Sequence, residues 1–317
     1  MYGDPLLPVI VSASRETDVP AFYADWLVHR LRDGWCAWKN PFNGEVRKVS
    51  FNKTRIIVFW SKNPKPMLDK LSEIEALGFR QYYFQFTLND YMAEGMEPNV
   101  PPVAERIDTF KRLADRIGKE RVIWRFDPLM LTEKISIDAL LERVGNIGQQ
   151  LKGYTEKLVF SFIDIAAYRK VQKNLAGLGI REFSPDDQIK FAQGLAALNK
   201  GLGLELATCG ELADLGAYGI MHNKCVDDEL MMRLFHDDAE LMDFIGAEYD
   251  MFNGWQIKKS KKDKGQRKAC GCIVSKDIGM YNTCPHLCKY CYANFSDDVA
   301  RRNYQKYIEG YMCDDCL

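Results

Sequence analysis

Six short apolar segments, separated by amphipathic ones, constrain the fold of this chain more than any other feature. They are rich in β-branched and aromatic residues and are bounded by loop residues, which is typical of buried strands. They cover residues 8–12, 55–60, 81–87, 121–126, 157–163 and 202–207. Strands that alternate with helical periodicity indicate βα units and a parallel sheet. We therefore expect an α/β fold, a partial (β/α) barrel with six or more parallel strands.

The amphipathic segments between these strands supply the expected helices. They span residues 20–32, 66–77, 103–117, 137–150 and 186–199. Several begin with proline or an acidic residue, as helices commonly do. Weaker apolar patterns predict an extra strand or hairpin over residues 44–51 and a short strand around residues 272–275 that closes or flanks the barrel.

Length, charge and cysteine content limit the class of protein. The 317 residues carry a formal net charge of −1, so the chain as a whole has no general attraction to nucleic acid. The sequence shows neither an apolar run of transmembrane length nor a signal peptide, so we expect a cytoplasmic protein without a membrane partner. Ten cysteines clustered toward one end of a long cytosolic chain favour metal binding over disulfides.

Three cysteines near the C-terminus have the spacing of iron–sulfur ligands. Cys284, Cys288 and Cys291 form a CxxxCxxC pattern, which suits three corners of a cubane [4Fe–4S] cluster. The fourth iron then lacks a protein ligand and is open to a small molecule. A structural zinc site, completed by a neighbouring cysteine or by His286, is the alternative.

The segment from Thr283 to Asn294, with Tyr290 before its last cysteine, resembles the cluster motif of the radical S-adenosylmethionine enzymes. In that family the open iron chelates the amino and carboxylate groups of methionine, and an electron from the cluster produces a 5'-deoxyadenosyl radical. The motif's aromatic residue lies against the adenine. The resemblance implies S-adenosylmethionine as a cofactor with Tyr290 in its site, an electron donor such as flavodoxin or ferredoxin, and a small-molecule or macromolecular substrate.

The motif lies close to the C-terminus, whereas those enzymes usually carry it after their first strand. One uncharacterised microbial family of unknown function combines a barrel body with such a C-terminal cysteine cluster. The chain resembles that family over nearly its whole length, through residues 12–18, 61–64 and 125–128 and the cysteine block. We expect a barrel over residues 1–250 and, over residues 251–317, a basic linker and cysteine-rich iron–sulfur segment packed on the barrel mouth.

Polar residues follow the predicted strands, where the loops of a parallel barrel converge. The candidate catalytic residues are Arg15, Glu16, Lys62, Arg125 and Asp127. We expect one of the cations to meet the methionine carboxylate, and one of the carboxylates to accept from its ammonium or from the ribose hydroxyls. A structural pairing of Arg125 with Asp127 inside the barrel is the alternative.

The sequence has no Gly-Gly-Glu-like segment, by which radical S-adenosylmethionine enzymes bind the methionine amine. Residues 14–17 take the corresponding place if the cysteine loop follows the last strand and that strand borders the first. This rearrangement predicts Ser14 and Glu16 as cofactor-binding residues, with Glu16 as the partner of the amine.

Four further cysteines predict a second metal site. Cys209 follows the sixth strand, Cys225 lies in a later loop, and Cys270 and Cys272 closely precede the motif. Together they suit a second iron–sulfur cluster or a zinc ion. The alternative is that Cys209 and Cys225 are packing residues. We expect no ligand role for the terminal cysteine pair in residues 313–316.

These patterns predict a radical S-adenosylmethionine-like enzyme. The alternative is a metal-stabilised binding or nucleic-acid-repair-associated protein without radical activity, in which the cysteines are structural. A lysine-rich run over residues 258–268 would suit contact with a nucleic-acid backbone, and a solvated linker is its other interpretation.

Overall fold

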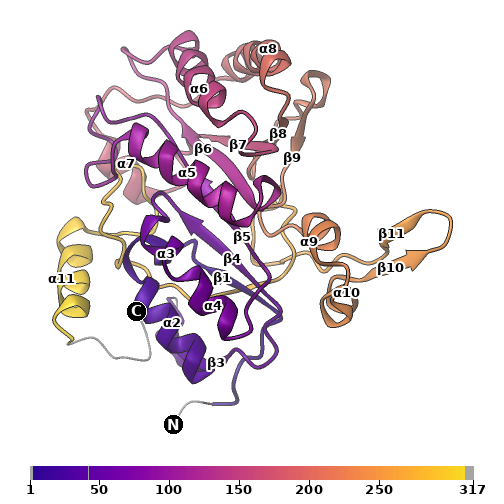
Figure 1. The fold of residues 1–317 in the computed structure, drawn as a ribbon. Helices are drawn as coiled ribbons and strands as arrows, with labels where there is room; N and C mark the ends of the chain where they lie inside the picture. Colours follow the sequence, from indigo (N-terminus) through magenta and orange to yellow (C-terminus); the bar gives the residue numbers. More distant parts are fainter. Residues whose placement is uncertain (1–2, 42, 311–317) are drawn as a thin grey trace.

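An eight-stranded parallel sheet organises the protein in the computed structural model, which describes residues 3–41 and 43–310. The strands follow the order β12-β1-β4-β5-β6-β7-β8-β9, with helices on both sides (Figure 1). They are β1 (Ile10–Ala13), β4 (Ile56–Ser61), β5 (Tyr82–Thr87), β6 (Val122–Leu129), β7 (Lys157–Phe162), β8 (Glu205–Thr208), β9 (Ile220–His222) and β12 (Lys276–Asp277). All six expected strands are present, and the predicted partial (β/α) barrel is confirmed as an open sheet with β12 and β9 at its edges.

Helices connect consecutive strands where the amphipathic segments predicted them. They are α1 (Val19–Phe22), α2 (Ala24–Asp33), α3 (Lys65–Leu68), α4 (Leu71–Ala76), α5 (Val103–Ile117), α6 (Ile137–Leu151), α7 (Arg169–Leu175) and α8 (Pro185–Leu202), with short 3-10 turns η1 (Lys119–Arg121) and η2 (Gly216–Tyr218). The first two expected helices are each divided in two, and α7 was not expected. The local sequence explains where helix α8 begins, because Ser184 and Asp187 form a capping box around Pro185.

Two apolar clusters cover the two faces of the sheet. In β4, Ile57 and Phe59 belong to the cluster under α1–α8, whereas Ile56 and Val58 face the opposite cluster. Helices α9 (Asp228–Phe235) and α10 (Ala239–Ile245) fill that second cluster. Burial on both faces explains why these strands are continuous apolar runs in the sequence.

The chain returns to its first strand near its end. The short strand expected around residues 272–275 is found slightly later, as β12, which pairs in parallel with β1. Val11 lies beside Lys276, and Ser12 lies beside Asp277. The rearranged order considered from the sequence, in which the last strand borders the first and precedes the cysteine loop, is therefore present.

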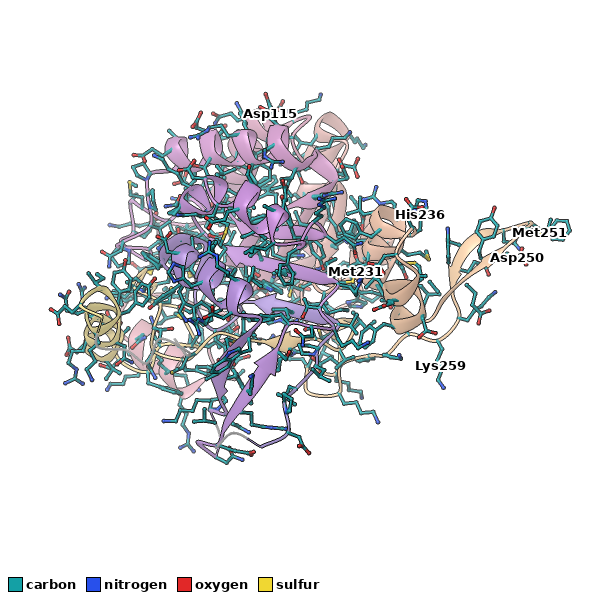
Figure 2. All side chains as sticks on the ribbon, turned by 60° about the horizontal axis from the view of Figure 1, so that its bottom comes forward. Asp115, Met231, His236, Asp250, Met251 and Lys259 are labelled. Atoms are coloured by element: carbon teal, nitrogen blue, oxygen red, sulfur yellow. The ribbon has the colours of Figure 1, made fainter. Side chains whose placement is uncertain are left out.

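Two antiparallel hairpins lie outside the sheet. Strands β2 (Trp35–Lys39) and β3 (Val46–Ser50) form the hairpin expected around residues 44–51. Strands β10 (Ala247–Asp250) and β11 (Gly254–Ile257) form a second hairpin that projects from the body, with Asp250 and Met251 at its far end (Figure 2). The expected division of the chain after residue 250 falls at the turn of this hairpin and stays a prediction.

The C-terminal helix α11 (Asp297–Ile308) packs on the N-terminal helices, on the side of the molecule away from the β10–β11 hairpin (Figure 1). Its Tyr304 makes edge contacts with the rings of Phe22 and Tyr23, and its Tyr307 contacts Tyr23. Within the described part of the chain, none of the helices combines the length and apolar composition needed to cross a membrane.

A buried ring at the centre of the sheet tests this arrangement. Phe84 in β5 is 0% exposed and stacks on Phe59 with ring centroids 4.6 Å apart. We expect Phe84→Ala to lower the free energy of unfolding by about 3–5 kcal/mol, because a cavity replaces the ring. Chemical denaturation measures this change. Phe252→Ala, at the hairpin turn with 95% exposure, is the matched control and should change the free energy by less than about 0.5 kcal/mol.

Candidate functional site

The CxxxCxxC cysteines lie in the loop between β12 and α11, beside the end of β1. Backbone and side-chain bonds fold this loop on itself. The Cys291 amide donates to the Cys288 carbonyl at 3.0 Å, and the Asn294 side-chain amide donates to the Cys284 carbonyl at 2.7 Å. The Tyr23 hydroxyl donates to the Thr283 carbonyl at 2.6 Å and joins the loop to the start of α2. The three cysteines therefore belong to one ordered loop.

A buried histidine fastens the loop to the barrel mouth. His286 is 2% exposed, with Nε2 at 2.8 Å from an Asp18 carboxylate oxygen and Nδ1 at 3.2 Å from the Asn99 carbonyl. The same carboxylate oxygen accepts from the Lys62 backbone amide at 2.7 Å. Both ring nitrogens face acceptor oxygens. The sequence offered His286 as a candidate zinc ligand, and the structure gives it this anchoring contact.

The three thiols lie within electrostatic reach of one another. Burial raises the pKa of Cys284 to about 12 and also raises that of Cys288, and the charge of Cys291 acts in the same direction on both. Among the described residues, no three histidine, cysteine, aspartate or glutamate side chains are arranged to hold a single metal ion. An iron–sulfur cubane requires a different arrangement of ligands from a single ion, because each thiolate binds a different iron.

Tyr290 is held by a buried polar network that includes a residue not predicted from the sequence. Its hydroxyl donates to the Glu97 carboxylate and accepts from Lys62 Nζ at 2.8 Å and from the Asn89 amide at 3.1 Å. Lys62 Nζ also lies 2.7 Å from Glu97. Burial raises the pKa of Glu97, but the charges of Lys62 and Arg106 outweigh it and lower the pKa to about 2. Lys62 is thus engaged with an ionised carboxylate beside the cysteine loop.

Arg125 and Asp127 pair with each other within β6. Arg125 Nε lies 3.1 Å from the Asp127 carboxylate, and its Nη2 donates to the same oxygen. The Ser161 hydroxyl donates to the other carboxylate oxygen. Arg125 Nη1 also donates to Gln85 at 3.1 Å. The structure thus brings these two predicted residues together. It does so as the Arg125–Asp127 pair that the sequence analysis gave as the structural alternative to a catalytic role.

Arg15 and Glu16, at the end of β1, retain polar atoms without partners. The Asp277 carboxylate accepts from the Ser14 hydroxyl at 2.5 Å and from the Arg15 amide at 2.9 Å. Arg15 Nη2 and Glu16 Oε2 are buried and have no hydrogen-bond partner among the described residues. Burial, aided by the charge of Asp277, raises the pKa of Glu16 to about 8. The Tyr292 hydroxyl donates to the Arg15 carbonyl at 3.1 Å, so both side chains lie beside the cysteine loop.

The unsatisfied atoms, Arg15 Nη2 and Glu16 Oε2, are a donor and an acceptor of the kinds that bind a zwitterion. A guanidinium matches the carboxylate of a methionine group, and a carboxylate matches its ammonium. Buried polar groups of native proteins normally have partners, so these two atoms are available to an external ligand. The residues at the end of β1 therefore fit the cofactor that the sequence implied.

The four cysteines outside the loop come together within the barrel. Cys209 Sγ and Cys225 Sγ are 3.4 Å apart, and the Cys225 amide donates to Cys272 Sγ at 3.2 Å. A hydrogen bond with the Cys272 thiol lowers the pKa of Cys270 to about 7. The predicted grouping of the four thiols is thus present, and metal binding there stays a prediction. The terminal cysteine pair in residues 313–316 lies outside the described residues.

An open groove leads to the cysteine loop. It has a volume of about 440 Å³ and is lined in part by Tyr168, Lys170 and Tyr292. The rings of Tyr168 and Tyr292 stack with centroids 5.6 Å apart. The lysine-rich run reaches this groove at Arg267, which donates to the Tyr168 hydroxyl at 2.6 Å and to Asp164 at 2.7 Å. The groove therefore combines aromatic and cationic surface next to Cys291.

Sequence reasoning missed Asp277 and Glu97. Asp277 belongs to the site because β12 pairs with β1, and it is 265 residues away from its partner Ser12. Glu97 lies in the loop after β5, where no motif surrounds it. A polar residue directly after a weak strand pattern was the one available signal for Asp277.

In comparisons with known proteins, one protein-family model matches most of the chain. The sequence pattern described as "Domain of unknown function (DUF1848)" matches residues 10–293. No curated protein matches the chain. Among solved structures, a candidate alpha-L-fucosidase from Bacteroides thetaiotaomicron is similar with a TM-score of 0.27 and 13% identity, covering 82% of this chain and 82% of that chain. A similarity this low carries no inference about fold or function.

The His286 contact is testable without any bound cofactor. We expect His286→Ala to lower the local stability of residues 283–294 by about 1–3 kcal/mol, because the buried Asp18 carboxylate loses a hydrogen-bond partner. Hydrogen exchange of peptides from this loop measures the change. His236→Ala, at a side chain 48% exposed, is the matched control and should leave the loop's exchange unchanged. Equal protection in both variants would show that His286 does not fasten the loop.

Proposed function

Since the chain belongs to the DUF1848 family, whose description names no activity, we propose its function from the site. We propose a radical S-adenosylmethionine-like enzyme that uses a [4Fe–4S] cluster to start radical chemistry on its substrate. One observation carries the proposal. The CxxxCxxC loop is fastened beside Arg15 and Glu16, whose buried Nη2 and Oε2 atoms lack partners among the described residues.

The cysteine loop would hold the cluster at three corners. Cys284, Cys288 and Cys291 are the ligands, and one iron remains open for the cofactor. When bound, such a cluster supplies the electron that cleaves S-adenosylmethionine. The chain contributes a fixed ligand loop, because His286 and Asp18 hold it to the barrel.

The end of β1 would hold the methionine group. Arg15 binds its carboxylate, and Glu16 accepts from its ammonium. Ser14 positions this segment through its bond to Asp277. Tyr290 borders the cofactor at the loop, with its hydroxyl fixed by Glu97. The other predicted catalytic residues, Lys62, Arg125 and Asp127, act through their ion pairs and shape the floor of the site.

The groove beside Tyr292 offers an approach for a substrate, either a small molecule or a macromolecule. Arg169, Lys170 and Lys173 add positive charge along it, which favours an anionic substrate or an acidic electron donor such as flavodoxin or ferredoxin. The eight described cysteines are all free, which suits a reducing compartment such as the cytoplasm.

A second candidate function rests on the same groove. In it the protein is a metal-stabilised binding or nucleic-acid-repair-associated module without radical activity, and the cysteines are structural. The position of Arg267 at the groove supports this alternative, because a basic segment beside aromatic rings can bind the phosphate backbone of a nucleic acid. The nature of the bound metal separates the two functions.

Metal analysis of a triad variant is the first test. We expect anaerobically reconstituted wild type to show a [4Fe–4S] electron paramagnetic resonance signal that changes when S-adenosylmethionine is added. Replacing Cys284, Cys288 and Cys291 by alanine should abolish this response and remove about four irons and four sulfides per chain. Cys36→Ala is the matched control and should keep both. Colourless protein with bound zinc would favour the alternative function.

The pH dependence of cofactor binding tests Glu16. Its pKa of about 8 means that the free protein holds a proton there at neutral pH. A bound ammonium favours the ionised form, so the proton must leave on binding, and affinity should rise with pH up to about pH 8, by at most about tenfold per unit. Calorimetric titration of S-adenosylmethionine at several pH values measures this slope.

Glu16→Gln should bind more weakly and lose this part of the slope, and the difference between the two proteins removes the cofactor's own titration. Glu211→Gln is the matched control. Burial raises the pKa of Glu211 to about 7. Its carboxylate accepts from the Phe162 amide at the end of β7, away from β1. An unchanged affinity and slope in Glu16→Gln would remove Glu16 from the cofactor site.

A further inference from the structure

The four cysteines within the barrel form a connected group that the proposed function does not use. Cys209 follows β8, Cys225 follows β9, and Cys270 and Cys272 lie just before β12. Cys209 and Cys225 have sulfur atoms 3.4 Å apart, and Cys272 accepts from the Cys225 amide at 3.2 Å. Segments far apart in the sequence thus deliver four thiols to one region of the interior.

Nitrogen donors surround two of the sulfur atoms. Cys225 Sγ accepts from Arg125 Nη1 at 3.0 Å and from the Asn223 side-chain amide at 3.1 Å. Cys272 Sγ accepts from the backbone amides of Cys225 and Val226 at 3.2 Å and 3.3 Å. A neutral thiol is a weak acceptor. Four N–H donors on two sulfurs suit thiolates, and such bonds accompany the thiolate ligands of iron–sulfur clusters.

The surrounding charge is also matched to an anionic centre. The guanidinium groups of Arg15 and Arg125 lie over the Trp60 ring, at 5.0 Å and 5.3 Å from its centroid. Arg125 has Asp127 as a partner, whereas the Arg15 guanidinium is 4.0 Å from its carboxylate neighbour Asp277. Buried cations require compensation. A cluster held by four thiolates carries net negative charge and would provide it.

We propose that Cys209, Cys225, Cys270 and Cys272 bind a second iron–sulfur cluster. Four thiolates complete its coordination, so this centre passes electrons and leaves no iron open to a substrate. The four cysteines contact one another in a row, each touching the next. Among the described residues, no three of these sulfurs surround a single ion. A cluster, whose thiolates are distributed over several irons, accommodates such an extended set. The proposal goes beyond the proposed function, because it does not depend on the CxxxCxxC loop.

The test begins from the variant in which Cys284, Cys288 and Cys291 are alanine. We expect this protein, reconstituted anaerobically, to retain iron and sulfide in equal amounts, about two or four of each per chain, with visible charge-transfer absorption. Adding Cys225→Ser and Cys272→Ser should remove the remaining iron, sulfide and colour. Adding Cys36→Ser instead is the matched control and should leave them in place. Circular dichroism of each variant confirms that the fold is kept.

Three results would overturn the second cluster. They are a triad variant without iron and sulfide, iron that survives the added serine substitutions, and one bound zinc per chain in place of iron. These outcomes are distinct from failure of the proposed function. If the triad variant loses all iron, the first cluster stands and the second is excluded. If the triad variant keeps all the iron of wild type and Cys225→Ser with Cys272→Ser removes it, the second cluster stands and the proposed radical function fails.

Discussion

The candidate site depends on one carboxylate, Asp277, which joins the last strand of the sheet to the first. Strand β12 has two residues, so its backbone pairing with β1 supplies few hydrogen bonds. Asp277 adds bonds from the Ser12 hydroxyl at 2.8 Å, the Ser14 hydroxyl at 2.5 Å and the Arg15 amide at 2.9 Å. Bonds to an ionised carboxylate are stronger than neutral ones. They fix the start of the cysteine loop against the segment that carries Arg15 and Glu16.

The central strands could be predicted because burial on both faces leaves a local signal. Segments such as Ile56–Ser61 are apolar at successive positions, which an exposed strand would not be. The elements that were missed lack such a signal. Strand β9 has three residues, two of them exposed, and the β10–β11 hairpin projects into solvent. Their conformation comes from pairing with a neighbour, and pairing cannot be read from a single segment.

The same distinction applies to the site. The spacing of Cys284, Cys288 and Cys291 is a local pattern, and the pairing of Arg125 with Asp127 follows because residues two apart share one face of a strand. The approach of Cys209 and Cys225 could be anticipated because β8 and β9 end at one mouth, whereas Cys270 and Cys272 precede β12 and join them through tertiary contacts. Lys62 was different. Its position against Glu97 depends on a loop without a motif, and its engagement could not be inferred from the sequence.

Arg15 interacts with both cysteine groups, and this position would couple them if both groups hold the proposed centres. Its guanidinium interacts electrostatically with Cys272 and Cys225 on one side and with Tyr292 of the cysteine loop on the other. A negatively charged centre at the four thiols would neutralise part of the positive charge of Arg15. That charge would otherwise be available to a cofactor carboxylate. Binding at either place would then change the affinity of the other, and linkage requires the effect to be reciprocal. One buried cation would thus link the oxidation state of the proposed inner cluster to cofactor binding at the barrel mouth.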